Sequence, residues 1–499
     1  GNLLRICNVG QGPEMAIPRP LSLPPLAVPR RLGTGTNARG ERATPYIFGI
    51  GTANPENVIP TMEAAEGLVG YYQGRMDERE ARRLRRIART CGIDQRRSVV
   101  TLEELNALGE ELKRGEVDLS FETRNDLYRQ YAPGLAVAAA SKALSDWGGR
   151  ASDITHVIGV TCTGLIVPGI EYHVIQGLGL PLTTQRLSIT LMGCFGGCSG
   201  LKAAAAIAAQ SSSHRVLVVC CELCTISSAM ATEVHTDQLI ASMLFGDGAS
   251  AIVVGSGIRA CSTTGSNDMS SSNEYSYTER PIYEFLKSGS CIIPNTLHMM
   301  GWDLSTNGWE ITLSQDITRQ LGDTICSFTD TLVRDALAPN NTSGGPTSSS
   351  QQQQQPQQQH ETTSGGAAGA GDSDQPQAAG GAAPRCPAAA LPSYSDMMWP
   401  LHPGGMAIIE AIEVACGLDP DFHTKSTRHV LKQVGNMSSG TVYFVLDELR
   451  KMPRDKLKPY AMMASFGPGL TTEGNLLRIC NVGQGPEMAI PRPLSLPPL

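Results

Sequence analysis

The 499-residue sequence lacks any apolar run that approaches the length of a membrane span, so no transmembrane segment is expected. Its net charge is only -7, which gives no reason to expect nucleic acid or an anionic membrane as a partner. A zinc site is not expected either, because the one C-x-x-C, at Cys221 and Cys224, has no second cysteine or histidine pair at zinc-site spacing. The 14 cysteines lie scattered, many in apolar runs, and this suits reduced, buried thiols of a cytoplasmic protein better than a disulfide framework.

The two ends of the chain share a repeat, because residues 1–26 are identical to residues 474–499. Two explanations stay open: an artefact of the gene model, or a tandem fusion in which one catalytic unit repeats. We expect residues 1–43 to form a disordered leader or linker and residues 483–499 to form a linker or tail. A transit peptide, with a plastid location, is the alternative for the arginine- and proline-containing part of the leader.

The rest of the sequence predicts an ordered α/β protein with one insertion. Continuous apolar strands at 156–161 and 215–221 alternate with helical patterns such as 136–147, which favours a layered fold with buried sheets. Residues 340–392 contain a glutamine run at 351–359 between Gly/Ala/Pro/Ser tracts. This segment has too little apolar surface to offset its ordering entropy, so we predict a disordered insertion in a surface loop.

Cys194 is the candidate nucleophile. It stands in the segment GCFGG at 193–197, after an apolar strand at 187–192 and before an alanine-rich helix at 201–210. A strand-to-helix turn with glycines allows close backbone approach, and the helix N-terminus favours a thiolate. Taken alone, a small buried cysteine in a packing turn is an equally good interpretation.

Two further segments complete a set of groups that acyl transfer requires. His402 in HPGG at 402–405 precedes a helix predicted at 406–416, where an imidazole can accept the thiol proton. Asn436 in GNMSS at 435–439 precedes a helix predicted at 441–449 and can donate to an oxyanion, although a helix-capping role explains it equally well by itself. A thiol, an imidazole and a carboxamide together indicate thioester chemistry.

These segments, with LFGDGA at 244–249 and GPG at 467–469, resemble the type III polyketide synthase family, the chalcone synthase relatives. The resemblance runs from IFGIGTANP at 47–55 to FGPGL at 466–470 and leaves out both termini and the glutamine-rich tract. It implies a thiolase-like αβαβα layered fold of two similar halves, assembled as a homodimer. Residues 44–255 would form the half with the nucleophile, and residues 256–339 with 393–482 the half with His402 and Asn436. The implied catalytic triad is Cys194, His402 and Asn436.

The resemblance also implies a substrate pocket. Phe245 would be a gatekeeper aromatic residue, while Ile311 stands where the family has a second gatekeeper phenylalanine. Arg86 and Arg89 are similar in placement to residues that hold coenzyme A phosphates, with solvated surface arginines as the alternative. TCTG at 161–164 and CELC at 221–224 look more like algal and bacterial members. The other implied pocket residues are Cys162, Thr163, Ser227, Trp302 and Ser438.

The activity implied by the resemblance is polyketide synthesis by an acyltransferase. An acyl-CoA starter would load onto Cys194, malonyl-CoA would be decarboxylated and condensed with it, and cyclisation would give a pyrone, resorcinol or phloroglucinol. Coenzyme A thioesters would be the substrates, with no metal or other cofactor. Two alternatives are a ketoacyl synthase III-type condensing enzyme and an inactive homodimeric scaffold. The isoleucine at 311 predicts room for an aliphatic starter.

Overall fold

The computed structural model describes residues 43–72, 74–114, 120–227, 236–263, 275–306, 308–338 and 391–480. The leader, the glutamine-rich insertion and the tail that the sequence predicts fall almost entirely outside these ranges. The second copy of the terminal repeat begins inside the final strand, β15 Thr471–Ile479.

One mixed sheet of nine strands runs through the described part of the chain, in the order β13-β14-β15-β10-β1-β7-β6-β4-β5. The strands β10-β15-β14-β13 repeat the arrangement β1-β7-β6-β4: two antiparallel pairings are followed by a parallel one. The two halves meet where β1 and β10 pair. This repeat confirms the prediction of two similar halves. The strands are β1 Pro45–Ala53, β4 His156–Thr161, β5 Gln185–Thr190, β6 Arg215–Leu223, β7 Asp247–Ser256, β10 Tyr283–Ile292, β13 Met397–Met398, β14 Tyr460–Gly467 and β15 Thr471–Ile479.

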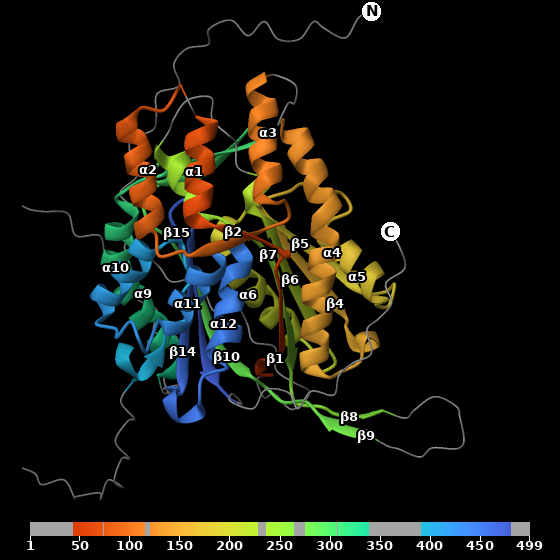
Figure 1. Cartoon of the computed structure of the whole chain (residues 1–499). Coiled ribbons are helices and arrows are strands. Elements are labelled where there is room, and N and C mark those ends of the chain that lie inside the picture. The colour runs from red at the N-terminus through yellow and green to blue at the C-terminus, as the bar shows by residue number, and fades with distance from the viewer. Residues whose placement is uncertain are drawn as a thin grey trace, which may run out of the picture.

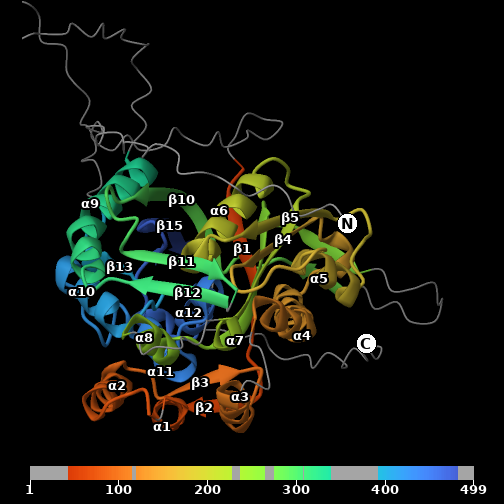
Figure 2. The same ribbon diagram turned by 90° about the horizontal axis from the view of Figure 1, so that it is seen from above.

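Helices form three layers around the two half-sheets (Figures 1 and 2). One pair, α4 and α5, covers the outer face of the first half, and α9 and α10 cover the outer face of the second. Two central helices, α6 and α12, share one apolar core with strands of both halves. The layers therefore follow the order αβαβα. The bounds are α4 Phe121–Trp147, α5 Ile170–Leu178, α6 Gly196–Ala208, α9 Ile317–Leu337, α10 Met406–Cys416 and α12 Thr441–Leu449.

Smaller elements cover one end of the layers, at the bottom of Figure 2. Three helices and a two-stranded sheet form this cover: α1 Thr61–Tyr71, α2 Glu78–Thr90, α3 Leu102–Arg114, β2 Asn57–Pro60 and β3 Gln95–Ser98. The remaining elements are α7 Cys224–Ser227, α8 Thr236–Leu244, α11 Lys425–Val434 and two hairpins, β8 Ala260–Thr263 with β9 Tyr275–Thr278 and β11 Met300–Ser305 with β12 Gly308–Leu313.

The helix predicted at 136–147 is longer than the sequence pattern indicated. It begins at Phe121, where the Ser120 side chain accepts a hydrogen bond from the backbone N–H of Thr123, and it continues through Pro133. The continuous line of buried alanines against the sheet, which includes Ala132 and Ala136, stabilises the helix on both sides of the proline. Tertiary packing thus overrides a local helix-breaking signal.

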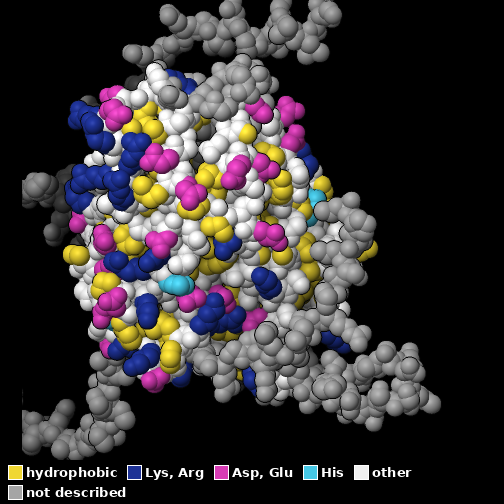
Figure 3. Space-filling model, viewed as in Figure 1, with side chains coloured by type: hydrophobic (Ala, Val, Ile, Leu, Met, Phe, Trp, Pro, Cys, Tyr) yellow, Lys and Arg dark blue, Asp and Glu magenta, His cyan; other side chains and the backbone are white. Residues whose placement is uncertain are grey.

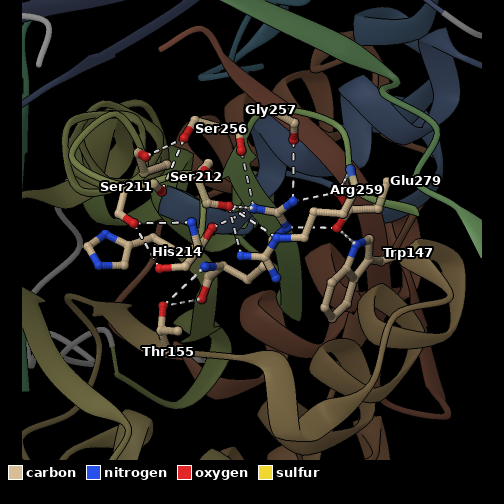
Figure 4. Close-up of polar contacts among 12 residues, drawn as sticks. Trp147, Thr155, Ser211, Ser212, His214, Ser256, Gly257, Arg259 and Glu279 are labelled. Atoms are coloured by element: carbon tan, nitrogen blue, oxygen red, sulfur yellow. Dashed lines mark hydrogen bonds and ion pairs between the residues drawn. The ribbon is translucent and has the colours of Figure 1, made fainter. Parts of the chain in front are cut away.

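A buried ion pair anchors the start of β6 to the chain between β9 and β10 (Figure 4). Glu279 accepts hydrogen bonds from Nε of Arg215 at 2.7 Å and Nε1 of Trp147 at 2.9 Å. The backbone N–H of Arg259 donates to the other carboxylate oxygen of Glu279 at 2.9 Å. Both charged side chains are fully buried. The carboxylate therefore connects α4, β6 and the base of the β8–β9 hairpin.

Candidate active site

Cys194 lies in a tight turn between β5 and α6. The turn is a 3-10 helix over Gly193–Phe195, and it places Cys194 at the N-terminal end of α6, where free backbone N–H groups create a positive potential. Gly193 has φ +69, and a Cβ atom there would lie 2.6 Å from Cδ of Pro468. The turn therefore requires glycine, as the sequence pattern indicated, and the cysteine is buried with 7 % of its surface exposed.

Asn436 and Ser438 meet Cys194 from the second half of the protein. The Ser438 hydroxyl lies 3.8 Å from Sγ of Cys194. Oδ1 of Asn436 accepts the backbone N–H of Ser438 at 2.8 Å, which leaves the amide nitrogen of Asn436 as the donor. Burial raises the pKa of the Cys194 thiol to about 12, while hydrogen bonds from Ser438 and Asn436 act in the opposite direction. The structure thus brings two of the three predicted triad residues together.

His402 follows β13 and is 1 % exposed. Its backbone N–H donates to the carbonyl of Ala464 in β14 at 2.7 Å. The Cys194 turn packs against the end of the same strand, since a Cβ atom on Gly467 would lie 3.4 Å from the backbone nitrogen of Cys194. Within the described ranges, neither ring nitrogen of His402 has a hydrogen-bond partner, and none joins it to Cys194. The imidazole is therefore placed near the nucleophile's turn with both nitrogens unpaired.

Burial makes a charge on either Cys194 or His402 alone unfavourable. It lowers the pKa of His402 to about 3 and raises the pKa of Cys194. Proton transfer from the thiol to the imidazole changes no net charge, and each ion then stabilises the other. The role of His402 as acceptor of the thiol proton, which would give a thiolate–imidazolium pair, stays a prediction.

Glu222, which the sequence analysis did not single out, lies directly behind the predicted pocket residues. It accepts hydrogen bonds from the backbone N–H of Cys162 at 3.0 Å and from the hydroxyl of Thr163 at 2.8 Å, and the Ser439 hydroxyl also donates to it. Burial raises the pKa of this carboxyl, and these hydrogen bonds oppose the rise. The available signal was a carboxylate that follows the apolar run 216–221 within strand β6.

The thiol of Cys162 connects this carboxylate to the nucleophile. Its Sγ is 3.6 Å from both carboxylate oxygens of Glu222 and 3.1 Å from the hydroxyl of Ser438. Ser438 is in turn the neighbour of Cys194. The predicted pocket residues Cys162, Thr163 and Ser438 therefore belong to one polar network that ends at the nucleophile. Ser227 is not part of it, because its hydroxyl donates to the carbonyl of Cys224 within α7 at 3.3 Å.

Phe245, Trp302 and Ile311 form an apolar wall next to Asn436. Phe245 and Asn436 form a backbone bridge, and the N–H of Gly246 donates to the Asn436 carbonyl at 3.0 Å. The rings of Phe245 and Trp302 meet edge to face with centroids 5.5 Å apart. Ile311 pairs with Trp302 across the β11–β12 hairpin. The tryptophan thus fills space next to the gatekeeper position, while Ile311 supports it from the next strand.

A cavity of about 450 Å³ extends from Phe245 toward the cover formed by α1 and α3. Phe245 and Cys224 lie on its inner side, and Leu68 and Leu105 line its outer part. Gly70 lines the cavity too, and a Cβ atom there would meet nothing within 4 Å. The cavity is bounded mainly by apolar side chains, and such a site is suited to an aliphatic group.

The comparison with known proteins agrees with this geometry. Residues 33–258 match the family model for chalcone and stilbene synthases, N-terminal domain, and residues 387–481 match the model for the C-terminal domain. The chain belongs to the type III polyketide synthase family. Its fold is accordingly thiolase-like, as the resemblance implied, and its relatives are enzymes that condense acyl units.

Individual relatives support the same assignment. The chain is 29 % identical to Probable polyketide synthase 1 of Dictyostelium discoideum over 433 residues, which are 87 % of this chain but only 11 % of that protein. It is 28 % identical to Bisdemethoxycurcumin synthase of Oryza sativa subsp. japonica over 89 % of this chain and 95 % of that protein. The chain also resembles a solved structure, the C-terminal type III polyketide synthase domain of Steely1, a type I/III hybrid from Dictyostelium. The two superpose with a TM-score of 0.68 at 29 % sequence identity, over 88 % of this chain and 100 % of the Steely1 domain.

In this polyketide synthase, Arg86 and Arg89 lie on α2. Both side chains are exposed, and Figure 3 shows Lys and Arg side chains gathered over this helix. Six arginines fall within its 13 residues. The structure places the two arginines in a basic surface that can attract phosphate, and it does not bring them to the nucleophile.

One further finding concerns membranes. None of the helices in the described ranges combines the length and apolar character needed to cross a bilayer. The sequence-based expectation about metals and cofactors stays a prediction.

Proposed function

We propose that this type III polyketide synthase loads an acyl-CoA starter onto Cys194 and extends it with units derived from malonyl-CoA. The observation that carries this proposal is the buried thiol at the N-terminus of α6, with Ser438 3.8 Å from its sulfur and Asn436 next to it. Thioester chemistry requires a nucleophile and fixed donors in a site that excludes water.

Loading is a thiol exchange. The thiolate of Cys194 attacks the carbonyl carbon of the starter, the tetrahedral oxyanion collapses, and coenzyme A leaves as a thiol with the proton that His402 accepted. Asn436 and the N–H groups at the start of α6 are the donors available for the oxyanion. Because these donors are fixed by the fold, they stabilise the transition state without reorganisation.

Extension uses the same donors for a second anion. Malonyl-CoA loses carbon dioxide, and the electron pair of the broken C–C bond forms the enolate of acetyl-CoA. His402 and Asn436 stabilise this enolate, which then attacks the Cys194 thioester and returns the thiolate. Each of these steps is redox-neutral and releases either carbon dioxide or a thiol, so we expect coenzyme A thioesters as substrates and no metal or redox cofactor.

The apolar cavity beyond Phe245 supports an aliphatic starter. Phe245 is one of its lining residues, and its lining is largely apolar. The basic surface of α2, with Arg86 and Arg89, is our proposed contact for the phosphates of coenzyme A, whose negative charges it would attract. The final cyclisation to a pyrone, resorcinol or phloroglucinol stays a prediction.

We also propose a homodimer that forms through the exposed edge strand β5. Its residues are largely exposed, including Leu187 at 42 %, and Leu191 and Val167 beside it are exposed at 58 % and 100 %. An unprotected edge with apolar neighbours is a surface that pairs with another chain. Light scattering after gel filtration should give a dimer for the wild type and for the matched control Val414→Asp, and a monomer for Leu187→Asp. A monomeric wild type would refute the dimer.

The test of the activity is acylation of Cys194. The purified protein is incubated with malonyl-CoA and acetyl-, octanoyl-, dodecanoyl- or 4-coumaroyl-CoA, and mass spectrometry follows both the Cys194 peptide and the released products. We expect acylation and polyketide products, lost in Cys194→Ala and retained in Cys291→Ser, whose thiol lies on β10. Products from acyl-carrier-protein thioesters alone would favour the ketoacyl synthase III-type alternative, and no acylation by either donor would favour the inactive scaffold.

A further inference from the structure

Two thiols from different helices meet on the outer layer of the second half. Cys326 in α9 and Cys416 at the end of α10 are free cysteines, and their sulfur atoms are 3.5 Å apart. The helices lie side by side in both views (Figures 1 and 2). The two residues are 90 positions apart in sequence, so only the packing of α9 on α10 creates this pair.

The surroundings allow reaction at this pair. Cys326 is partly exposed, whereas Cys416 is 7 % exposed, so a solution reagent reaches Cys326 first. The sulfur of Cys326 also lies 3.3 Å from the carbonyl of Ala415, which keeps it against the end of α10. Since a disulfide requires about 2.05 Å between sulfurs, the two sulfur atoms need to approach by roughly 1.5 Å for the bond to form.

We propose that Cys326 and Cys416 form a redox-active dithiol that closes to an intramolecular disulfide on exchange with a small disulfide such as oxidised glutathione. The thiolate of Cys326 attacks the reagent and releases one glutathione thiolate. The deprotonated Cys416 then attacks the sulfur of Cys326 in the mixed disulfide and releases the second one. The two protons lost by the cysteines end on the two glutathione molecules, and the protein loses two electrons.

The bond would join the chain on both sides of residues 339–390. It would close a loop that begins in α9, passes through that segment and His402, and ends at the last residue of α10. Cross-linking a long loop removes conformational entropy from the unfolded chain. Because α10 begins four residues after His402, the bond also fixes the far end of the helix that follows the catalytic imidazole. The dithiol therefore adds a redox-dependent clamp that the condensation chemistry does not require.

The experiment equilibrates the full-length protein, under native conditions, with mixtures of reduced and oxidised glutathione. Digestion without reduction should give one cross-linked peptide pair containing Cys326 and Cys416, lighter by about 2 Da than the reduced pair. The melting temperature should rise by at least about 2 °C on oxidation and return on reduction.

Variants separate the clamp from general oxidation. Cys416→Ser should stop at a glutathione adduct on Cys326, with no rise in melting temperature, and Cys326→Ser should form neither product at Cys416. Cys291→Ser, the matched control on β10, should cross-link like the wild type. A stable glutathione adduct on Cys326 in the wild type, or a cross-link found only after unfolding in urea, would overturn the proposal. Both readouts are independent of catalysis, so failure of the proposed activity leaves this test intact.

Discussion

Replacing His402 by glutamine tests whether the imidazole controls the ionisation of Cys194. Glutamine keeps hydrogen-bonding groups and similar size but cannot take up the thiol proton. In His402→Gln, Cys194 retains the burial that raises its pKa to about 12, together with the hydrogen bonds from Ser438 and Asn436. The variant therefore removes the charge partner and leaves the rest of the thiol's environment in place.

The expected size of the effect follows from the interaction between the thiolate and a protonated His402. A thiol with a pKa of 12 is ionised to roughly 3 parts in 100,000 at pH 7.5. With the thiol proton held on His402, the positive charge within about 4–6 Å would lower the pKa of Cys194 by about 1–3 units, which corresponds to about a 10- to 1,000-fold larger thiolate fraction. Such a pair at neutral pH requires the pKa of His402 to lie above the value of about 3 that burial alone gives. We expect the wild-type thiol to react at least about 10-fold faster than the variant thiol at pH 7.5.

The assay measures the rate of alkylation of the Cys194 peptide by iodoacetamide between pH 6 and pH 10, read by mass spectrometry. In the variant, the rate should rise about tenfold per pH unit across this range, because the thiolate fraction rises with pH below the pKa. The wild-type rate should depend less steeply on pH, since the proton stays within the pair. Cys291 serves as the internal control and should react alike in both proteins. Superimposable Cys194 profiles would refute the role of His402 as charge partner.

Three further changes test other parts of the structure. Glu279→Ala removes the acceptor of the buried ion pair in Figure 4 and should lower the free energy of unfolding in urea by about 3–5 kcal/mol; a loss below about 1 kcal/mol would contradict a structural role. Gly193→Ala should abolish acylation of Cys194, because the added Cβ atom would clash with Pro468. The control is Gly179→Ala, which is also at positive φ but has open space around it and should keep activity. Equal activity of the two variants would show that the Cys194 turn tolerates a side chain. Gly70→Phe should fill part of the cavity, so kcat/KM should fall about 10-fold for dodecanoyl-CoA and stay unchanged for acetyl-CoA. An equal loss of kcat/KM for both starters would show that the cavity does not bind the acyl chain.

The sequence carried most of the information about the catalytic turn. The glycines around Cys194 indicated a strand-to-helix turn, and the structure has the residue between β5 and α6. The helices predicted after His402 and Asn436 have the observed bounds, Met406–Cys416 and Thr441–Leu449. Such features are local, because glycine at positive φ and apolar periodicity act within a few residues.

The pocket was less predictable because its contacts join distant segments. Glu222 appeared in the sequence analysis only within CELC at 221–224 and without a role, yet it organises Cys162 and Thr163 through hydrogen bonds across about 60 positions of sequence. Ser227 stays a predicted pocket residue, and only the structure shows that its hydroxyl donates to the carbonyl of Cys224 within α7. A motif identifies residue types, whereas the direction of a buried side chain depends on which partners the fold brings to it.

By itself the sequence predicted the protein family and the layered α/β architecture, and it supplied a thiol, an imidazole and a carboxamide as the candidate catalytic groups. Only the tertiary structure decided that Asn436 and Ser438 contact Cys194, that His402 has unpaired ring nitrogens, and that Cys326 meets Cys416. The physical reason is that local propensity and periodicity specify the elements, while distances of 3–4 Å between side chains depend on how the layers pack.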